Sequence, residues 1–540
     1  MYLRSNHKTL GAGNFHSAVG NKLIRGDLVQ QALRQGLAPK KGLSAFVFKY
    51  DKSLEKPLAV GIIGTGTQGL RLLAAVNPAY IAVKSIADVR PSNVAKALDA
   101  LKSVYKDKAW KTPDEVKKDV KVYDAFGKLI DAAKADGLEA VVIALPSHLH
   151  AAASLAAMKA GLHVLVETPM ALSVADAKEM ARTAKEKKLC LAVGQQRRYS
   201  LVYDNALEMV RKSLLEDVHY IRAQWHVPKP EKKAADKVAK KGDAKGPEKV
   251  DAPRIDWWRD VPDEDKAIKA ADFNYDSLEQ LVHWQFVEKL SGGLVLELGS
   301  QLFDASSMVL AASPNRDPAR TFPLSVAGSG SQLSRNNRGD IDDHVHCVFE
   351  YTEKDYVDFG PPKSRKKIGM QFDFIFGNEF DGYGETVLGR KGSLVLENEQ
   401  RGMLWHMSDT DKSIRVVKKE DKKKAKDAKD SKDVKDAKDG PVVPAIELPD
   451  DGKADAEAMA LGELALHGID AGYAAELEHW AVCCRKPSEE NKPRGDAAAG
   501  LTTVVLAVAA SKAIKLGTRI DFKKEWFDVE SKETPDDLKT

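Results

Sequence analysis

The chain has 540 residues, too many for one compact core, so its length favours two domains with insertions. Its 83 Lys and Arg residues nearly balance its 79 Asp and Glu residues, leaving a formal net charge of +4. This balance gives no electrostatic reason to expect a nucleic-acid partner, and a small anionic or neutral ligand fits better.

Residues 1–55 show no clear hydrophobic period and are interpreted as an N-terminal arm. This region has no apolar stretch of the kind found in secretory signals. The chain has four cysteines, none with metal-ligand spacing: Cys190, Cys347, Cys483 and Cys484. We therefore predict reduced thiols that pack as small core residues in a cytoplasmic protein, and no metal site.

From residue 56 to about 195, apolar strands alternate with helical patterns. Strands are expected at 58–64, 80–89, 139–146, 163–167 and 189–194. Helices are expected at 67–76, 125–137, 148–161 and from Ser173 onward. Ser147 is expected to cap the third of these helices, and His150 to face its exterior. Strands separated by such helices predict a doubly wound parallel sheet, a Rossmann domain of the α/β class.

Residues 196–540 have a different spacing and predict a second, α+β domain. Its strands, expected at 218–227, 324–330, 344–352, 372–377 and 392–399, are separated by loops, which favours an open, largely antiparallel sheet. Two Lys- and Asp-rich segments, 229–249 and 418–440, contain no aromatic residue and are interpreted as solvated insertions.

Two late helices are expected to be buried. The helix at 472–485 places Tyr473, Leu477, Trp480, Ala481 and Cys484 on one face, so it should pack on a core. The apolar segment 501–516 is shorter than a bilayer span, which predicts a buried helix and no membrane partner.

A glycine-rich motif lies where the first strand passes into the first helix. It consists of Gly64, Thr65, Gly66, Thr67, Gln68 and Gly69. In a GxGxxG motif of this context the first glycine makes the turn, the second lets a pyrophosphate approach and the third permits close packing. Asp88 ends the next strand roughly 20 residues later, where an acid bonds a ribose hydroxyl. The pattern predicts NAD binding, although the nearby Arg90 leaves NADP open.

Further candidates follow the ends of the later strands. Pro146 and His148 follow one strand and Glu167 ends another, so all three are expected on the nicotinamide side of the cofactor. Tyr199 and His283 are candidate catalytic groups, but an ordinary core or helix role is the alternative for each.

The order of motifs resembles the Gfo/Idh/MocA family of oxidoreductases. The resemblance rests on VGIIGTGTQG, IADV, the run from ALPSHLH to VETPMAL, GQQRRYS, SGGLVLELGSQLFDAS and LEHWAVCCRKP, and covers about 56–525 outside the insertions and a poorly matched stretch around 312–340. It implies a Rossmann domain followed by a substrate domain whose open sheet often forms a homo-oligomer interface. Typical members use NAD or NADP to oxidise or reduce a sugar, cyclitol or related polyol.

Two positions depart from the signature that the resemblance implies. Thr168, in Glu-Thr-Pro, stands where the family has a lysine, and Gln301 stands where it has a histidine. Neither can replace those groups, because threonine carries no cation and glutamine is no base. Glu297 is the best remaining candidate for a general base, with pairing to Arg197 or Arg198 as its alternative role.

These departures leave three functions open. The first is an NAD(P)-dependent oxidoreductase acting on a small carbohydrate-like substrate. The second is an enzyme that retains NAD and cleaves a glycosidic bond without net redox change. The third is a catalytically degenerate nucleotide-binding protein, because a fold alone does not establish chemistry.

Overall fold

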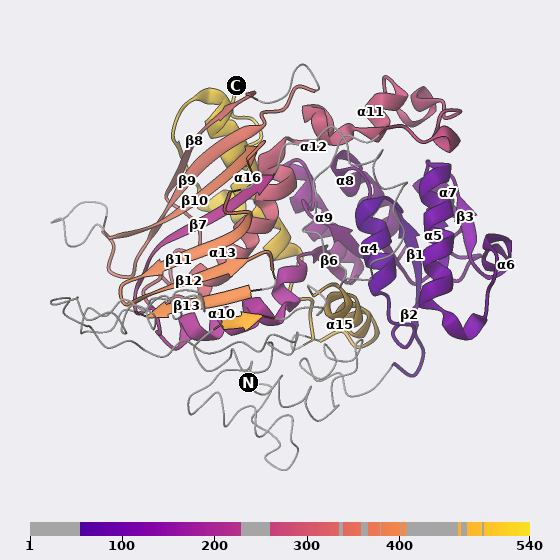
Figure 1. Cartoon of the computed structure of the whole chain (residues 1–540), viewed down its shortest axis with the longest axis horizontal. Coiled ribbons are helices and arrows are strands. Elements are labelled where there is room, and N and C mark those ends of the chain that lie inside the picture. The colour runs from indigo at the N-terminus through magenta and orange to yellow at the C-terminus, as the bar shows by residue number, and fades with distance from the viewer. Residues whose placement is uncertain are drawn as a thin grey trace, which may run out of the picture.

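The computed structural model describes residues 54–227, 260–333, 339–357, 366–378, 380–399, 401–406, 463–465, 472–488 and 491–539. The expected arm up to residue 53 and the insertions at 229–249 and 418–440 lie outside the described residues. Within them the chain forms two sheets with helices between (Figure 1).

The first sheet is parallel throughout and has the order β3-β2-β1-β4-β5-β6. Its strands are β1 Leu58–Ile63, β2 Ile81–Ala87, β3 Lys121–Tyr123, β4 Ala140–Ile143, β5 His163–Glu167 and β6 Leu191–Gly194. Its helices are α4 Thr67–Ala75, α5 Pro91–Val104, α6 Pro113–Asp119, α7 Phe126–Ala132, α8 His150–Lys159 and α9 Val174–Lys187. The predicted Rossmann sheet is confirmed, and its order reverses between β1 and β4, where such sheets bind ligands.

The second sheet is mixed, with one parallel pair among antiparallel ones, and has the order β14-β13-β12-β11-β7-β10-β9-β8-β15. Its strands are β7 Val218–Val227, β8 Ser325–Ser331, β9 His344–Thr352, β10 Lys367–Phe376, β11 Tyr383–Gly389, β12 Gly392–Glu397, β13 Arg401–His406, β14 Glu463–Ala465 and β15 Ile520–Asp521. The expected α+β class is confirmed, although the sequence pattern missed β11, β13, β14 and β15.

Helices from the second half join the two sheets. α13 Ser300–Ala312 and α16 Ala497–Leu516 share one core with strands of both sheets, and α10 Leu201–Arg211 packs against α13. Phe303 of α13 makes edge contacts with Phe372 of β10, their ring centroids 5.3 Å apart. The continuous core fixes α13, and with it Glu297 just before α13, against the carboxyl ends of the Rossmann strands.

The late helix α15 Tyr473–Arg485 packs on the Rossmann sheet rather than on the second sheet, beside α4 in Figure 1. Trp480 and Leu477 are buried in one cluster with Ile62 of β1, so the expectation of a core-packing face is confirmed. Arg485 donates two hydrogen bonds to the carboxylate of Glu139, at 2.5 and 2.6 Å. A helix from near the C-terminal end of the sequence therefore forms part of the core of the Rossmann half.

Two helical stretches, Glu288–Ala312 and Ala497–Leu516, are long and apolar enough to cross a membrane by length and composition alone. The second corrects our expectation for segment 501–516, since the helix is 20 residues long. In both cases most of the apolar window is buried within the protein, 78% and 61% respectively, as in the core helix of a soluble protein.

Candidate active site at the carboxyl edge of the parallel sheet

The glycine loop joins β1 to α4, and at two of its glycines the backbone is packed too closely against other backbone atoms to leave room for a side chain. Gly64 has φ +85°, and a Cβ there would lie 2.4 Å from the Ala144 carbonyl oxygen. A Cβ on Gly69 would lie 2.0 Å from the Gly64 oxygen. A Cβ on Gly66, by contrast, would have only the Asn93 amide nitrogen nearby, at 3.8 Å. The protein itself does not need a glycine at 66, so the open backbone there fits the approach of a ligand.

Asp88 follows β2 and faces the same loop. Its carboxylate accepts hydrogen bonds from the Thr65 backbone N–H at 2.7 Å and from the Thr65 hydroxyl at 3.2 Å. It also accepts one from the Arg90 N–H at 2.8 Å, while burial raises its pKa. Asp88 thus lies where a ribose next to the loop would meet it, and the Arg90 side chain turns away to Asp265, with Nε 2.8 Å from the carboxylate.

The Glu-Thr-Pro corner ends β5. Glu167 is buried and accepts a hydrogen bond from Gln68 of the glycine loop at 2.8 Å. Gly194 of β6 makes room for it, because a Cβ at Gly194 would lie 2.4 Å from the Glu167 carboxylate. Burial raises the pKa of Glu167 to about 7. Thr168 reaches the other way and donates from its hydroxyl to Ser300 Oγ at 3.1 Å.

Glu297 lies in a π-helical segment, Val295–Gly299, immediately before α13. Such local widenings of a helix are frequent at functional sites. Its carboxylate accepts a short hydrogen bond from the hydroxyl of Ser147, which follows β4. Burial raises the pKa of Glu297 to about 8, yet the residue keeps some exposed surface. A carboxyl with this pKa can take or give a proton near neutral pH.

The Ser147 contact corrects two expectations. The Ser147 side chain does not cap a helix, because the chain first makes a short 3-10 turn, Ser147–Leu149, and the hydroxyl faces Glu297 instead. Glu297 does not take the alternative role of an arginine partner either. Arg198 pairs with Asp304, with its Nε 2.9 Å and Nη2 2.6 Å from one carboxylate oxygen, and Arg197 pairs with Glu385 at 3.0 Å.

The two histidines after β4 differ in role. The expectation that His150 faces the helix exterior is wrong: it is 1% exposed, and its ring nitrogens lie 2.7 Å from the Pro169 oxygen and 2.8 Å from the Leu145 oxygen. His150 therefore ties the end of β4 to the corner after β5. His148 has a buried Nδ1 without a hydrogen-bond partner in the described part of the chain, and burial lowers its pKa to about 4.

The remaining catalytic candidates are placed differently. Tyr199 is buried, with its hydroxyl 3.0 Å from His479 Nδ1 and accepting from the Arg494 N–H at 2.8 Å, and burial raises its pKa well above 10. His283 contacts the carbonyl of Glu279 one turn earlier, at 3.1 Å. These contacts favour the structural alternative for both residues. Gln301 is half-buried at the start of α13, next to Ser300.

The arrangement brings together the glycine loop, the corner after β5 and the Ser147–Glu297 pair. Several features fit a dinucleotide: the open backbone at Gly66, the N-terminus of α4, the carboxylate of Asp88 and the unpartnered His148 Nδ1. Pro146 starts the turn that carries Ser147 and His148. Sequence reasoning missed Ser147 as a site residue, because its position before a helix pattern suggested a cap.

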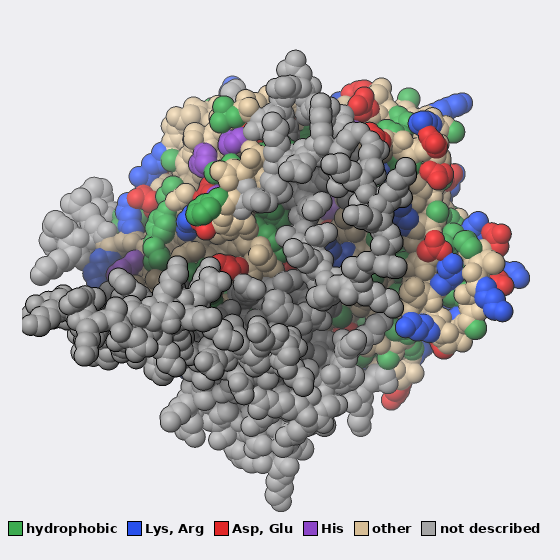
Figure 2. Space-filling model, in the orientation of Figure 1, with side chains coloured by type: hydrophobic (Ala, Val, Ile, Leu, Met, Phe, Trp, Pro, Cys, Tyr) green, Lys and Arg blue, Asp and Glu red, His purple; other side chains and the backbone are tan. Residues whose placement is uncertain are grey.

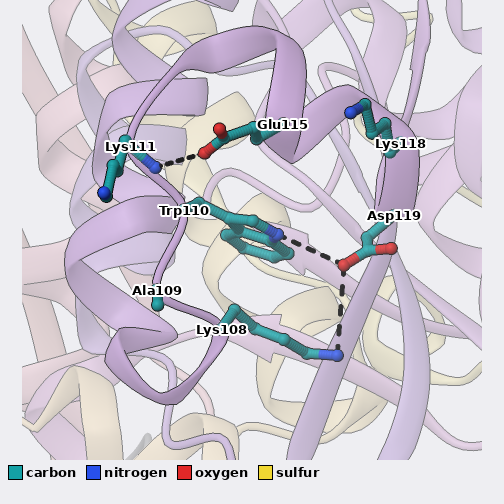
Figure 3. A pocket seen from close by; sticks show the side chains of 7 residues that line it. All are labelled: Lys108, Ala109, Trp110, Lys111, Glu115, Lys118 and Asp119. Carbon is teal, nitrogen blue, oxygen red and sulfur yellow. Dashed lines mark hydrogen bonds and ion pairs between the residues drawn. The ribbon is translucent and has the colours of Figure 1, made fainter.

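A surface hollow of about 350 Å³ lies elsewhere, at the α6 end of the Rossmann half (Figure 3). Its polar groups are paired with one another: Trp110 donates to Asp119 at 3.2 Å, and the Lys111 N–H donates to Glu115 at 2.6 Å. On the face drawn in Figure 2, acidic and basic side chains are interspersed over this half. The hollow offers none of the buried titratable groups found at the strand ends.

A Rossmann domain with a glycine loop, joined through α13 to an open mixed sheet, is an architecture suited to binding a dinucleotide. Residues 58–195 match the family model GFO_IDH_MocA, described as an oxidoreductase family with an NAD-binding Rossmann fold. This match places the Rossmann half of the chain in the Gfo/Idh/MocA family, as the resemblance of its motifs indicated.

Relatives agree with this placement. A scyllo-inositol 2-dehydrogenase (NADP(+)) of Bacillus subtilis is 28% identical over 121 residues, which are 22% of this chain and 34% of that protein. An inositol 2-dehydrogenase of Corynebacterium glutamicum is 27% identical over 179 residues, 32% of this chain and 47% of that protein. The first three curated relatives are matched over only 34%, 23% and 26% of their lengths.

Among solved structures, a levoglucosan dehydrogenase in complex with NADH and levoglucosan has a similar fold. The TM-score is 0.53 at 15% identity, and the match covers 87% of this chain and 100% of that one. The WlbA dehydrogenase of Bordetella pertussis matches with a TM-score of 0.51 at 14% identity, over 87% of this chain and 99% of that one. The likeness in fold therefore extends through both sheets.

Proposed function

We propose that this chain is an NAD(P)-dependent oxidoreductase that acts on a hydroxyl or ketone of a sugar, cyclitol or related polyol. One observation carries the proposal. Glu297, a residue that keeps some exposed surface, has a carboxyl pKa raised by burial to about 8 and is held by Ser147 at the carboxyl edge of a dinucleotide-binding sheet. A proton-accepting group at that edge is what alcohol oxidation by a nicotinamide requires.

The glycine loop would hold the cofactor. The backbone at Gly66 and the N-terminus of α4 suit the pyrophosphate, and Asp88 suits the adenosine ribose. A dinucleotide held by these residues would supply hydride-transfer chemistry at the carboxyl edge of the sheet. Glu167 is buried behind this site and bonded to Gln68, so its role is to fix the loop to the end of β5.

Glu297 balances the hydride with a proton. In the oxidising direction its carboxylate takes the hydroxyl proton as the C–H bond is broken; in the reducing direction its carboxyl returns that proton to the ketone oxygen. Ser147 orients the carboxyl through its hydrogen bond. Thr168 and Gln301 are neutral polar groups near the start of α13 and would bind substrate hydroxyls without supplying charge.

The substrate class is supported by the relatives' names, which include inositol dehydrogenases and a levoglucosan dehydrogenase. A cytoplasmic location is part of the proposal. It is supported by the four cysteines, all of which are free thiols.

Turnover of a panel of sugars and cyclitols with NAD or NADP tests the proposal, read as absorbance of the reduced nicotinamide. Glu297→Gln should lower kcat by about 100-fold or more, because an amide cannot accept the proton. Glu186→Gln, at an exposed position on α9, is the matched control and should leave kcat unchanged.

Three results would contradict the proposal. The first is the absence of nicotinamide reduction with both cofactors across the panel, despite measurable dinucleotide binding, which would favour a degenerate nucleotide-binding protein. The second is unchanged kcat in Glu297→Gln. The third is cleavage of an aryl glycoside without accumulation of reduced nicotinamide, which would replace the proposal with the NAD-retaining reaction.

A further inference from the structure

A segment of the second half, residues 260–291, lies over the Rossmann domain at its carboxyl edge. It comprises the short turns Asp263–Asp265 and Ala270–Phe273 and the helices α11 Leu278–Val282 and α12 Glu288–Ser291. Figure 1 shows α11 and α12 above α8. The segment has its own small apolar cluster, which includes Tyr275 and contacts Val89 just after β2. Tyr275 also makes an edge contact with His148, their ring centroids 5.6 Å apart.

The segment inserts one carboxylate, Asp265, at the N-terminus of α5. The Asp265 side chain has 0% exposure and accepts from the Ser92 N–H at 3.0 Å, the Ser92 hydroxyl at 2.6 Å and Arg90 Nε at 2.8 Å. Burial alone would raise the pKa of Asp265, but the hydrogen bonds from Ser92 and Arg90 outweigh it and lower the pKa. This is a built anion site, with an arginine, a hydroxyl and a helix N-terminus, and its anion is part of the chain.

The Asp265 site lies close to the place where the adenosine ribose of a bound dinucleotide is expected. Asp88, two residues before Arg90, faces the glycine loop, where the adenosine ribose would lie. In dinucleotide domains an arginine near that acid accommodates the 2′-phosphate of NADP. Here the guanidinium of Arg90 is bonded to Asp265, and the two carboxylates together would repel a phosphate.

We infer that Asp265 selects NAD(H) over NADP(H) by occupying the anion site beside the ribose and holding Arg90 away from a 2′-phosphate. The inference rests on the proposed binding of a dinucleotide at the glycine loop. Asp265 is a specificity residue that reaches the cofactor site from a different part of the chain, 173 residues beyond Ser92. Its partner Arg90 becomes a binder of the 2′-phosphate only when Asp265 is removed.

The test compares the dissociation constants of NADH and NADPH for the full chain, measured by calorimetry and by nicotinamide fluorescence. The unaltered protein should bind NADH at least tenfold more tightly than NADPH. Asp265→Asn keeps the size of the side chain and removes its charge, and Asp265→Ser also opens space. Both should tighten NADPH binding by tenfold or more, with NADH binding changed by less than threefold.

Two further variants sharpen the result. Asp263→Asn is the matched control, because Asp263 lies in the same turn with a side chain 90% exposed, and it should leave both constants unchanged. Adding Arg90→Gln to Asp265→Ser should abolish the gain in NADPH affinity, since that gain depends on the freed guanidinium.

Three results would overturn the inference. Equal binding of NADH and NADPH by the unaltered chain does so without any variant. The inference also fails if the ratio of the NADPH and NADH dissociation constants in Asp265→Asn stays within twofold of that of the unaltered chain, while thermal unfolding shows that the variant is folded. A chain that binds neither dinucleotide contradicts the proposed function and this inference together, whereas an unchanged ratio contradicts the inference alone.

Discussion

Replacing Gly66 by alanine should abolish tight dinucleotide binding without destabilising the fold. Gly66 has φ −68° and ψ −162°, a conformation open to any residue, and its added Cβ would have only one neighbour, Asn93 Nδ2 at 3.8 Å. The free energy of unfolding should therefore change by less than about 1 kcal/mol. The methyl group would, however, stand where a pyrophosphate must approach the backbone.

The loss of affinity follows from the contacts that this approach provides. A hydrogen bond from a backbone N–H to a charged phosphate is worth about 1.5 to 3 kcal/mol, so displacement of the pyrophosphate should raise the Kd of NADH by about tenfold to 100-fold. Isothermal calorimetry gives the Kd, and thermal unfolding gives the stability.

Gly64→Ala and Gly69→Ala provide the contrast. Their Cβ atoms would lie 2.4 Å and 2.0 Å from backbone oxygens of the protein itself, so both variants should unfold at clearly lower temperature than Gly66→Ala. The reasoning is refuted if Gly66→Ala binds NADH within threefold of the unaltered chain, or if it is as unstable as the other two.

Three other predictions concern stability. Gly194→Ala should destabilise the protein by about 1 to 3 kcal/mol in chemical unfolding, because the new Cβ meets the Glu167 carboxylate 2.4 Å away; an unchanged midpoint would contradict this packing. The melting temperature of Glu297→Gln minus that of the unaltered chain should increase as pH rises from 5 to 9. The folded-state pKa of Glu297, about 8, exceeds the ordinary 4.5, so its stabilising effect is full below pH 4.5 and is lost as pH rises through 8; a pH-independent difference would argue against this. Leu477→Ala should cost about 2 to 5 kcal/mol, since Leu477 of α15 is 1% exposed in the Rossmann core, and near-neutral behaviour would mean that α15 is dispensable there.

The Rossmann half was predictable because its signals are local. Each expected strand is a short apolar run, and the expected helices have their own stops or starts, such as Gly161 after α8 or Ser173, whose hydroxyl accepts from the Asp176 N–H at 3.1 Å. The short, partly exposed β3 and the helices α5 and α6 were missed. The same local reasoning failed at Ser147 and His150. Their polar atoms are satisfied by partners far along the chain or across a turn, which periodicity does not reveal.

Other parts of the site had no local signal. The π-helical segment that presents Glu297 follows from tertiary packing, and the sequence around it reads as an ordinary apolar helix. Asp265 lies in a charged stretch typical of a solvated loop, yet its carboxylate is fully buried against Arg90 and Ser92. Glu297 became the candidate general base only because Thr168 and Gln301 stand where the family has a lysine and a histidine.

The pH dependence of kcat/KM for substrate oxidation tests most directly whether Glu297 moves the proton. With its pKa near 8, initial rates should rise with pH through that value, because the carboxylate is the active form. Ser147→Ala removes a hydrogen bond that lowers this pKa, so the rising limb should shift to higher pH. The assignment would be contradicted if the rise of kcat/KM occurred at the same pH in Ser147→Ala as in the unaltered chain, or if Glu297→Gln showed the same rise with undiminished kcat/KM.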